Sequence, residues 1–276
     1  MTPKLKKERA DKILVERGLA ATRQKAQALI MAGLVATEGR RVEKAGQPLN
    51  PETSLTVEKP LPYVSRGGLK LEQALDEFAV DPAGRVCADV GSSTGGFTDC
   101  LLQRGAARVT CVDVDIRQLD DRIRRDRRVV TLEKNARNLG PGDFEPIPSL
   151  VVMDVSFISV LKILPALRGV FTAAPARPGD PSPLLLSLIK PQFEAGRGQV
   201  GKKGIIRDPK LHAEILIRIA GEAASLGFTL GGLVRCSTRG QKGNQEFFAC
   251  FVPGRVEPPG EDVIKWVREA VRNETD

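Results

Sequence analysis

A glycine-rich turn between an apolar run and an amphipathic segment constrains this 276-residue chain more than any other feature. Residues 86–102 read VCADVGSSTGGFTDCLL, with Asp89 near the end of the apolar run. A strand, a tight turn and a helix N-terminus in this order are typical of cofactor sites in α/β sheets. The turn needs glycine because a side chain would block the approach of the ligand. The sequence therefore predicts an α/β domain that binds a cofactor.

The residues around this turn favour one class of cofactor. Asp113 ends the next apolar run, where a carboxylate suits the hydroxyls of a ribose. The turn lacks the G-x-G-x-x-G fingerprint of an NAD-dependent oxidoreductase, and no G-K-[ST] follows as in a P-loop. Asp89 would repel a phosphate but attract a sulfonium, so we expect S-adenosylmethionine. The predicted cofactor-binding residues are Asp89, Gly91, Ser92, Ser93, Thr94, Gly95, Gly96, Phe97, Thr98 and Asp113.

The excess positive charge of the chain is concentrated near its N-terminus. Residues 1–66 carry 13 Lys and Arg against 7 Asp and Glu, whereas the rest of the chain carries 29 against 27. Apolar spacing predicts a helix ending at Gly18, then a helix between Thr22 as N-cap and Gly33 as C-cap, then short extended segments. A compact basic module beside a near-neutral domain is typical of a nucleic-acid-binding appendage on an enzyme.

Residues 8–60 resemble the alpha-L RNA-binding module first described in a small-subunit ribosomal protein. The resemblance rests on RADKILVERGLAATRQKAQALIMAGLV, including its Gly-Leu turn and the Thr-Arg that follows. It implies binding to structured RNA through outward cations and amides. The predicted RNA-binding residues are Arg9, Arg23, Gln24, Lys25, Gln27, Arg40, Arg41, Lys44 and Arg66.

Two further apolar runs lead into charged residues. Residues 150–155 (LVVMDV) contain Asp154, and residues 184–189 (LLLSLI) are followed by Lys190. The carboxyl ends of parallel strands form the edge at which α/β sheets bind ligands. We therefore expect Asp154 and Lys190 to face the same site as the glycine-rich turn.

Lys70 and Glu246 complete a set of four candidate catalytic residues. Lys70 is expected in the first turn of a helix that starts near Gly67, where the helix dipole disfavours a cation, and this indicates a purpose beyond helix stability. Glu246 opens the apolar segment EFFACFV. At this point the chain resembles the FtsJ-like RNA 2′-O-methyltransferases, which use a Lys-Asp-Lys-Glu tetrad. More narrowly it resembles the TlyA family, also called hemolysin A, of 16S/23S rRNA (cytidine-2′-O)-methyltransferases.

The segments SRGGLKL, DVGSSTGGFTD, MDVSFIS, LIKPQFEAGR and GNQEFF carry this resemblance, in this order along the chain. It implies that Lys70, Asp154, Lys190 and Glu246 are the tetrad. The substrate would be the 2′-hydroxyl of a cytidine in 16S or 23S rRNA. Lys190 would activate that hydroxyl, either as a neutral base or as a cation that stabilises the alkoxide. The carboxylates would orient the lysines, and no metal is required.

The resemblance to the methyltransferases implies a Rossmann-like, seven-stranded class I fold with a reversed final hairpin, beside a small α+β RNA-binding domain. We expect the RNA-binding domain over residues 1–60, a linker over 61–66 and the methyltransferase domain over 67–276. The pattern predicts strands over 107–113, 128–132, 150–155 and 184–189 and an antiparallel pair over 228–235 and 246–252. It predicts helices near 116–126, 208–226 and 260–272.

Other function classes receive little support. The five cysteines are far apart and His212 is the only histidine, so a disulfide framework, a His-based triad and a multi-His metal site are not expected. No signal peptide or membrane-length apolar run is present, so we expect a cytoplasmic protein, with a monomer as the default state. A membrane-active hemolysin and a non-catalytic ribosome-binding factor remain the alternatives.

Overall fold

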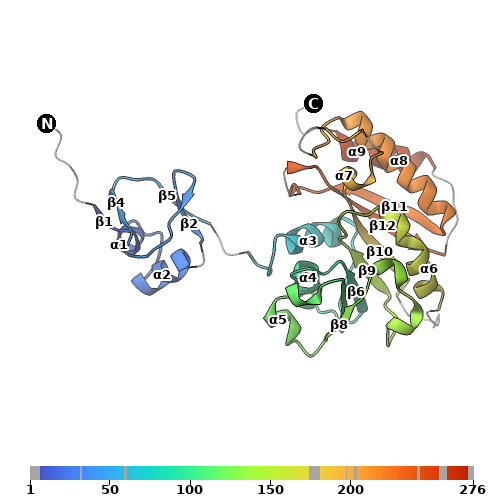
Figure 1. Cartoon of the computed structure of the whole chain (residues 1–276), viewed down its shortest axis with the longest axis horizontal. Helices are drawn as coiled ribbons and strands as arrows, with labels where there is room; N and C mark the ends of the chain where they lie inside the picture. Colours follow the sequence, from blue (N-terminus) through green and yellow to red (C-terminus); the bar gives the residue numbers. More distant parts are fainter. Residues whose placement is uncertain are drawn as a thin grey trace. The chain divides into compact units, whose positions relative to one another are not determined.

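The computed structural model describes residues 7–31, 33–58, 61–173, 181–196, 198–201, 204–240, 243–254 and 260–272. Arg197, at the end of LIKPQFEAGR, and residues 1–6 and 59–60 of the expected RNA-binding domain lie outside these ranges. Contacts divide the chain into two compact units, Met1–Leu61 and Pro62–Asp276, which are described separately. Figure 1 shows the elements of each unit.

The first unit packs two helices, α1 (Ala10–Glu16) and α2 (Arg23–Met31), against short strands. A three-stranded sheet has the order β3-β2-β5, with bounds Arg40–Arg41, Val35–Thr37 and Leu55–Val57, and β1 (Glu8–Arg9) pairs with β4 (Pro48–Leu49). Thr22 accepts the Lys25 N–H at 3.2 Å, which confirms the predicted N-cap. Gly33 adopts a φ of 70°, as a C-cap glycine does. The β1–β4 pair was not expected, because two-residue strands carry no readable periodicity.

The second unit contains the predicted seven-stranded sheet, in the order β11-β12-β10-β9-β6-β7-β8. All neighbouring pairs among β6 to β10 are parallel, whereas β12 runs antiparallel to both β10 and β11. This confirms the predicted fold class and the predicted antiparallel pair, β11 and β12. The strand bounds are Val86–Val90 (β6), Arg108–Asp113 (β7), Val129–Glu133 (β8), Leu150–Met153 (β9), Leu184–Ile189 (β10), Phe228–Arg235 (β11) and Phe247–Pro253 (β12).

Helices cover both faces of this sheet (Figure 1). Successive strand residues point to opposite faces, and β9 shows this alternation directly. Leu150 and Val152 join the cluster under α3 (Gly67–Glu77), α4 (Gly96–Gln103) and α5 (Asp121–Arg124). Val151 and Met153 join the cluster under α6 (Leu164–Thr172), α8 (Pro209–Ser225) and α9 (Glu261–Val271). The five cysteines are all free and buried.

The predicted helix over 116–126 was wrong in form. The structure has a 3₁₀ turn, Ile116–Gln118, and then the short α5. Leu119 and Asp120 between them have extended ψ angles of 129° and 138°. Asp120 starts a new helix by accepting the Arg122 N–H at 2.8 Å, so the local cap overrides a continuous helix. Strand β9 also ends earlier than expected, at Met153, and α6 and α7 (Pro191–Glu194) were not predicted.

Two phenylalanines give a matched test of this core. Phe251 of the reversed strand is fully buried, whereas Phe157 is 90% exposed. Phe251→Ala should lower the free energy of unfolding by about 3–5 kcal/mol, because it leaves a cavity between strand and helices. Phe157→Ala should change it by less than about 0.5 kcal/mol.

Urea unfolding followed by tryptophan fluorescence measures this difference. Trp266 is the only tryptophan of the chain and lies on α9, so its signal reports on the second unit alone. Equal midpoints for the two variants would contradict the assigned core.

Candidate active site

The glycine-rich turn joins β6 to α4 and lies against the end of β9. Gly91 has a φ of 86°, and its N–H donates to the Val112 carbonyl at 2.8 Å. A Cβ at Gly91 would clash with the carbonyl oxygen of Asp154. Glycine is therefore required twice here, for the backbone conformation and for the close approach of two chain segments.

Asp89 supplies a fully buried carboxyl group beside this turn. Its Oδ2 accepts hydrogen bonds from the Thr98 N–H at 2.9 Å and the Thr98 hydroxyl at 2.7 Å. Its Oδ1 has no hydrogen-bond partner among the described residues, and Asp89 lines a cavity. Burial raises the pKa of Asp89 to about 7, although the Thr98 hydrogen bonds oppose the shift. Such a group fits a ligand that brings a positive charge.

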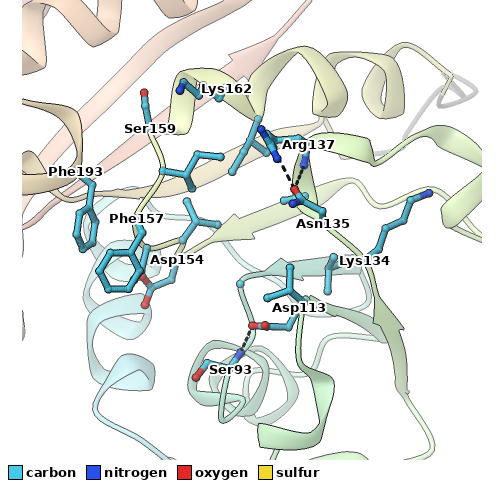
Figure 2. A pocket seen from close by; sticks show the side chains of 18 of the residues that line it. Ser93, Asp113, Lys134, Asn135, Arg137, Asp154, Phe157, Ser159, Lys162 and Phe193 are labelled. Atoms are coloured by element: carbon cyan, nitrogen blue, oxygen red, sulfur yellow. Dashed lines mark hydrogen bonds between the residues drawn. The ribbon is translucent and has the colours of Figure 1, made fainter. Parts of the chain in front are cut away.

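Asp113 ends β7 at the wall of a cavity of about 820 Å³. Its Oδ2 accepts the Ser93 N–H at 2.9 Å, as Figure 2 shows. Its Oδ1 accepts the Asp115 N–H at 3.1 Å. These bonds fix the carboxylate while its remaining lone pairs can accept from a ligand. Other residues line the same cavity but were not predicted, although they follow β8 or β9 at the same sheet edge: Lys134, Asn135, Ala136, Arg137, Ser156, Phe157, Ser159 and Lys162.

The four predicted catalytic residues meet in an adjoining cavity of about 420 Å³. Lys70 Nζ lies 2.5 Å from Glu246 Oε2, and Lys190 Nζ lies 2.5 Å from Asp154 Oδ1. Lys190 also donates to the Ser156 hydroxyl at 2.9 Å. The side chains of Lys70, Glu246 and Lys190 are 11%, 3% and 11% exposed. The cavity thus holds two mostly buried cation–anion pairs, with the glycine-rich turn in its wall.

The reversed strand explains how Glu246 reaches this cavity. Ile189 pairs with Phe247 in the antiparallel ladder, so the residue before β12 lies beside the residue after β10. A Cβ at Gly240 would clash with the Glu246 carboxylate, so the backbone of the preceding turn covers that side chain closely. Glu246 is therefore held from both sides.

Two aromatic rings in the walls of the cavities were not predicted. Phe157 and Phe193, both labelled in Figure 2, have ring centroids 4.9 Å apart. Both residues line both cavities. Phe157 is 90% exposed and has a φ of 63°, which is strained for a bulky residue. Lys190 Nζ lies 5.9 Å from the centre of the Phe193 ring. An exposed, strained aromatic ring beside reactive groups indicates a binding role.

Glu194 ties together the two loops that carry these groups. Its carboxylate accepts the Ser159 hydroxyl at 2.7 Å and the Val160 N–H at 2.8 Å. Its carbonyl oxygen accepts from Arg218 of α8 at 2.7 Å. Burial raises the pKa of Glu194, although the hydrogen bonds from Ser159 and Val160 lower it in part. The loop after β9 is therefore anchored to the loop after β10 at a second point besides Lys190.

The remaining predicted residues fall into three places. Ser92, Thr94, Gly96, Phe97 and Arg66 line the smaller cavity, whereas Gly95 packs toward Leu119 and Ile123 of the α5 side.

In the first unit, Arg9, Arg23 and Gln27 converge on Asp11. The other predicted RNA-binding residues of that unit are exposed: Gln24, Lys25, Arg40, Arg41 and Lys44. His212 is a packing residue that contacts the Phe247 ring edge to face.

Comparison with known proteins places this geometry in a family. Residues 63–252 match the FtsJ-like methyltransferase family and residues 8–55 match the S4 domain. The chain is 47% identical over 273 residues to YqxC, a candidate rRNA methyltransferase of Bacillus subtilis (strain 168), covering 96% of this chain and 94% of the relative. It is 44% identical over 246 residues to the 16S/23S rRNA (cytidine-2′-O)-methyltransferase TlyA of Mycobacterium tuberculosis, covering 88% and 89%.

A solved structure supports the same placement. A candidate hemolysin from Streptococcus thermophilus superposes with a TM-score of 0.71 at 38% identity, covering 97% of this chain and 96% of that one. The family match spans more than half of the chain, and it includes the glycine-rich turn and the four charged residues of the smaller cavity. The chain therefore belongs to the FtsJ-like methyltransferase family, among its TlyA-type members, and it carries an S4 domain in its N-terminal unit.

Proposed function

We propose that this protein transfers the methyl group of S-adenosylmethionine to the 2′-hydroxyl of a cytidine in 16S or 23S rRNA. The observation that carries the proposal is the meeting of Lys70, Asp154, Lys190 and Glu246 in one cavity beside the glycine-rich turn. Residues 67–276 would perform the transfer and residues 1–60 would bind the RNA, with residues 61–66 joining them. We expect a monomer that acts in the cytoplasm.

The residues around the turn fit S-adenosylmethionine. The Asp89 Oδ1 atom would face the cationic methionine end, because that oxygen is buried and lacks a partner within the described ranges. Asp113 would bind the ribose hydroxyls at the end of β7. The remaining contacts to S-adenosylmethionine would come from the turn itself and the start of α4. The residues concerned are Gly91, Ser92, Ser93, Thr94, Gly95, Gly96, Phe97 and Thr98. When bound, S-adenosylmethionine supplies a methyl group on a positively charged sulfur.

Lys190 would act on the attacking hydroxyl. As an ammonium held by Asp154 and Ser156, it can donate a hydrogen bond to the 2′-oxygen and stabilise the negative charge that develops there. The new bond between the 2′-oxygen and the methyl carbon would form as the bond from that carbon to sulfur breaks, so the methyl donor would leave as a neutral thioether, and the hydroxyl proton would pass to solvent water. Asp154 and Glu246 keep both lysines in fixed places, since each carboxylate lies 2.5 Å from one ammonium. Holding the hydroxyl in line with the methyl group contributes the rest of the rate.

Phe157 would hold the base of the target nucleotide. RNA-binding proteins stack unpaired bases on exposed aromatic rings. Phe157 offers such an exposed ring in the wall of both cavities, and the Phe193 ring packs beside it. The target ribose would then lie over Lys190.

Lys190→Met should lower the rate of methyl transfer to rRNA by at least ~100-fold, because the group that stabilises the developing charge is removed. The assay measures tritium transfer from labelled S-adenosylmethionine to 16S and 23S rRNA in unmodified ribosomal subunits. Lys210→Met, at an exposed position of α8, is the matched control and should keep the wild-type rate.

Retention of rRNA binding by Lys190→Met would separate catalysis from binding. A variant that binds RNA and S-adenosylmethionine normally but transfers no methyl group argues against a non-catalytic ribosome-binding factor. Wild-type transfer rates in Lys190→Met would refute the proposed tetrad.

The affinity for S-adenosylmethionine should rise with pH. Burial raises the pKa of Asp89 to about 7, so its carboxyl group is mostly neutral at pH 6 and mostly ionised at pH 8. Only the ionised form attracts a cation, and a pKa of about 7 then gives about tenfold tighter binding at pH 8 than at pH 6. Isothermal titration calorimetry at both values measures the ratio.

Asp89→Asn should bind S-adenosylmethionine weakly, and its affinity should not depend on pH between 6 and 8. Asp113→Asn should also weaken binding at every pH, but its affinity should still rise with pH as that of the wild type does. A wild-type affinity that is flat between pH 6 and pH 8 would show that Asp89 does not face the cationic end of the cofactor.

The hemolysin among the related structures motivates a second candidate function, lysis of membranes. Within the described part of the chain, no helix is long and apolar enough to cross a bilayer. Leakage of erythrocytes caused by the purified protein, equal for wild type and Lys190→Met, would favour that candidate.

A further inference from the structure

Asp11 is the most completely buried carboxylate of the first unit and is surrounded by donors. It lies in the first turn of α1, and its side chain is 0% exposed. Arg9 donates to it through Nε at 3.0 Å and through Nη2 at 2.9 Å. Arg23 donates at 3.2 Å and Gln27 at 2.9 Å, both from α2. Hydrogen bonds from Arg9 hold the pKa of Asp11 well below its ordinary value, so the group stays ionised at neutral pH.

The donors reach Asp11 from the solvent side. The Arg9 and Arg23 side chains are 49% and 57% exposed, although the carboxylate that they share is fully covered. Arg9 also lies against Gly46, where an added Cβ would come within 2.9 Å of its Nη1. These contacts therefore restrict the rotamers of the two arginine side chains at the surface.

Each of these groups keeps hydrogen-bonding capacity for a ligand. Arg23 uses only Nε on Asp11, and no partner within the described ranges takes its two terminal nitrogens. Arg9 likewise leaves Nη1 uncommitted among the described residues. Guanidinium groups with free N–H pairs bind phosphate oxygens in a fixed fork geometry. Gln24 and Lys25 are exposed beside Arg23 on α2 and extend the same surface.

We propose that Asp11 is a positioning residue for RNA: its buried carboxylate holds Arg9, Arg23 and Gln27 in one preformed fan that binds backbone phosphates of structured rRNA. The inference rests on the proposed function, which supplies the RNA. Asp11 offsets the repulsion between two neighbouring guanidinium groups and restricts their rotamers before binding. Less conformational entropy is then lost when the phosphates arrive.

This role makes a prediction opposite in sign to simple electrostatics. Removing a carboxylate from a surface that binds a polyanion should strengthen binding, since the net positive charge rises. If Asp11 positions the fan, Asp11→Asn should instead weaken binding to a mixture of isolated 16S and 23S rRNA about tenfold. The negative slope of log affinity against log salt concentration should become shallower by about one to two, as expected when one or two phosphate contacts are lost.

Glu16→Gln is the matched control, because Glu16 is an exposed acid on the same helix that pairs with Lys12. It removes the same charge and should leave binding unchanged or tighter. Filter binding of the full-length protein between 50 and 200 mM salt gives both affinity and slope. Hydrogen exchange of residues 10–31 verifies that the first unit is folded in each variant. At saturating RNA, Asp11→Asn should keep the wild-type kcat with a raised KM.

Arg9→Lys tests the proposal without altering a buried carboxylate. It preserves the charge but cannot make the two-pronged contact with Asp11, so binding should weaken several-fold, whereas Lys12→Arg should have no effect. If wild type binds rRNA and Asp11→Asn binds equally well or more tightly, the role of Asp11 is overturned while the proposed function stands. If the wild-type chain does not bind rRNA, the proposed function fails and this inference fails with it.

Discussion

The reversal of one strand decides where the chemistry of this protein can occur. In a parallel sheet only the residues after each strand reach the ligand-binding edge, as Asp154 and Lys190 do. Strand β12 runs the other way, so its first residues lie at that edge. The ladder between Ile189 and Phe247 then places Glu246 beside Lys190 and opposite Lys70. A cavity with both lysines and both carboxylates depends on this single antiparallel pairing.

Burial of charge is the second constraint, and pairing resolves it. An isolated ion in a low-dielectric site is strongly unfavourable, so each lysine of the cavity has a carboxylate at 2.5 Å. Asp89 has no such cation among the described residues, and burial raises its pKa. The two lysine–carboxylate pairs therefore balance their charges within the protein, whereas Asp89 fits a cation that comes from a ligand. The first unit applies the same rule to Asp11, where arginines at the surface neutralise a buried carboxylate.

The sequence predicts the sheet well because its strands leave strong local signals. The four candidate catalytic residues lie in one cavity, but the resemblance to a family, rather than local spacing, identifies Lys70 and Glu246, and the catalytic roles stay a prediction. Apolar runs with single charges at their ends identify β6, β7, β9 and β10, and the resemblance to the methyltransferases implies the seven-stranded fold class. The short strands of the first unit, α6 and α7 have no comparable periodicity. The residues that support the site were also missed. These supporting residues are Ser156, Phe157, Phe193 and Glu194. They make contacts of 2.7 to 4.9 Å between the segment after β9 and the segment after β10, and no spacing within one segment reveals such contacts.

The product nucleoside tests the central claim most directly. Ribosomal subunits methylated by the purified protein can be digested to nucleosides and analysed by mass spectrometry, with unmodified subunits as reference. We expect a new 2′-O-methylcytidine, with the added mass on the ribose fragment. A methyl group on a base fragment, or on ribosomal protein, would contradict the assignment of the Lys190 cavity to ribose methylation.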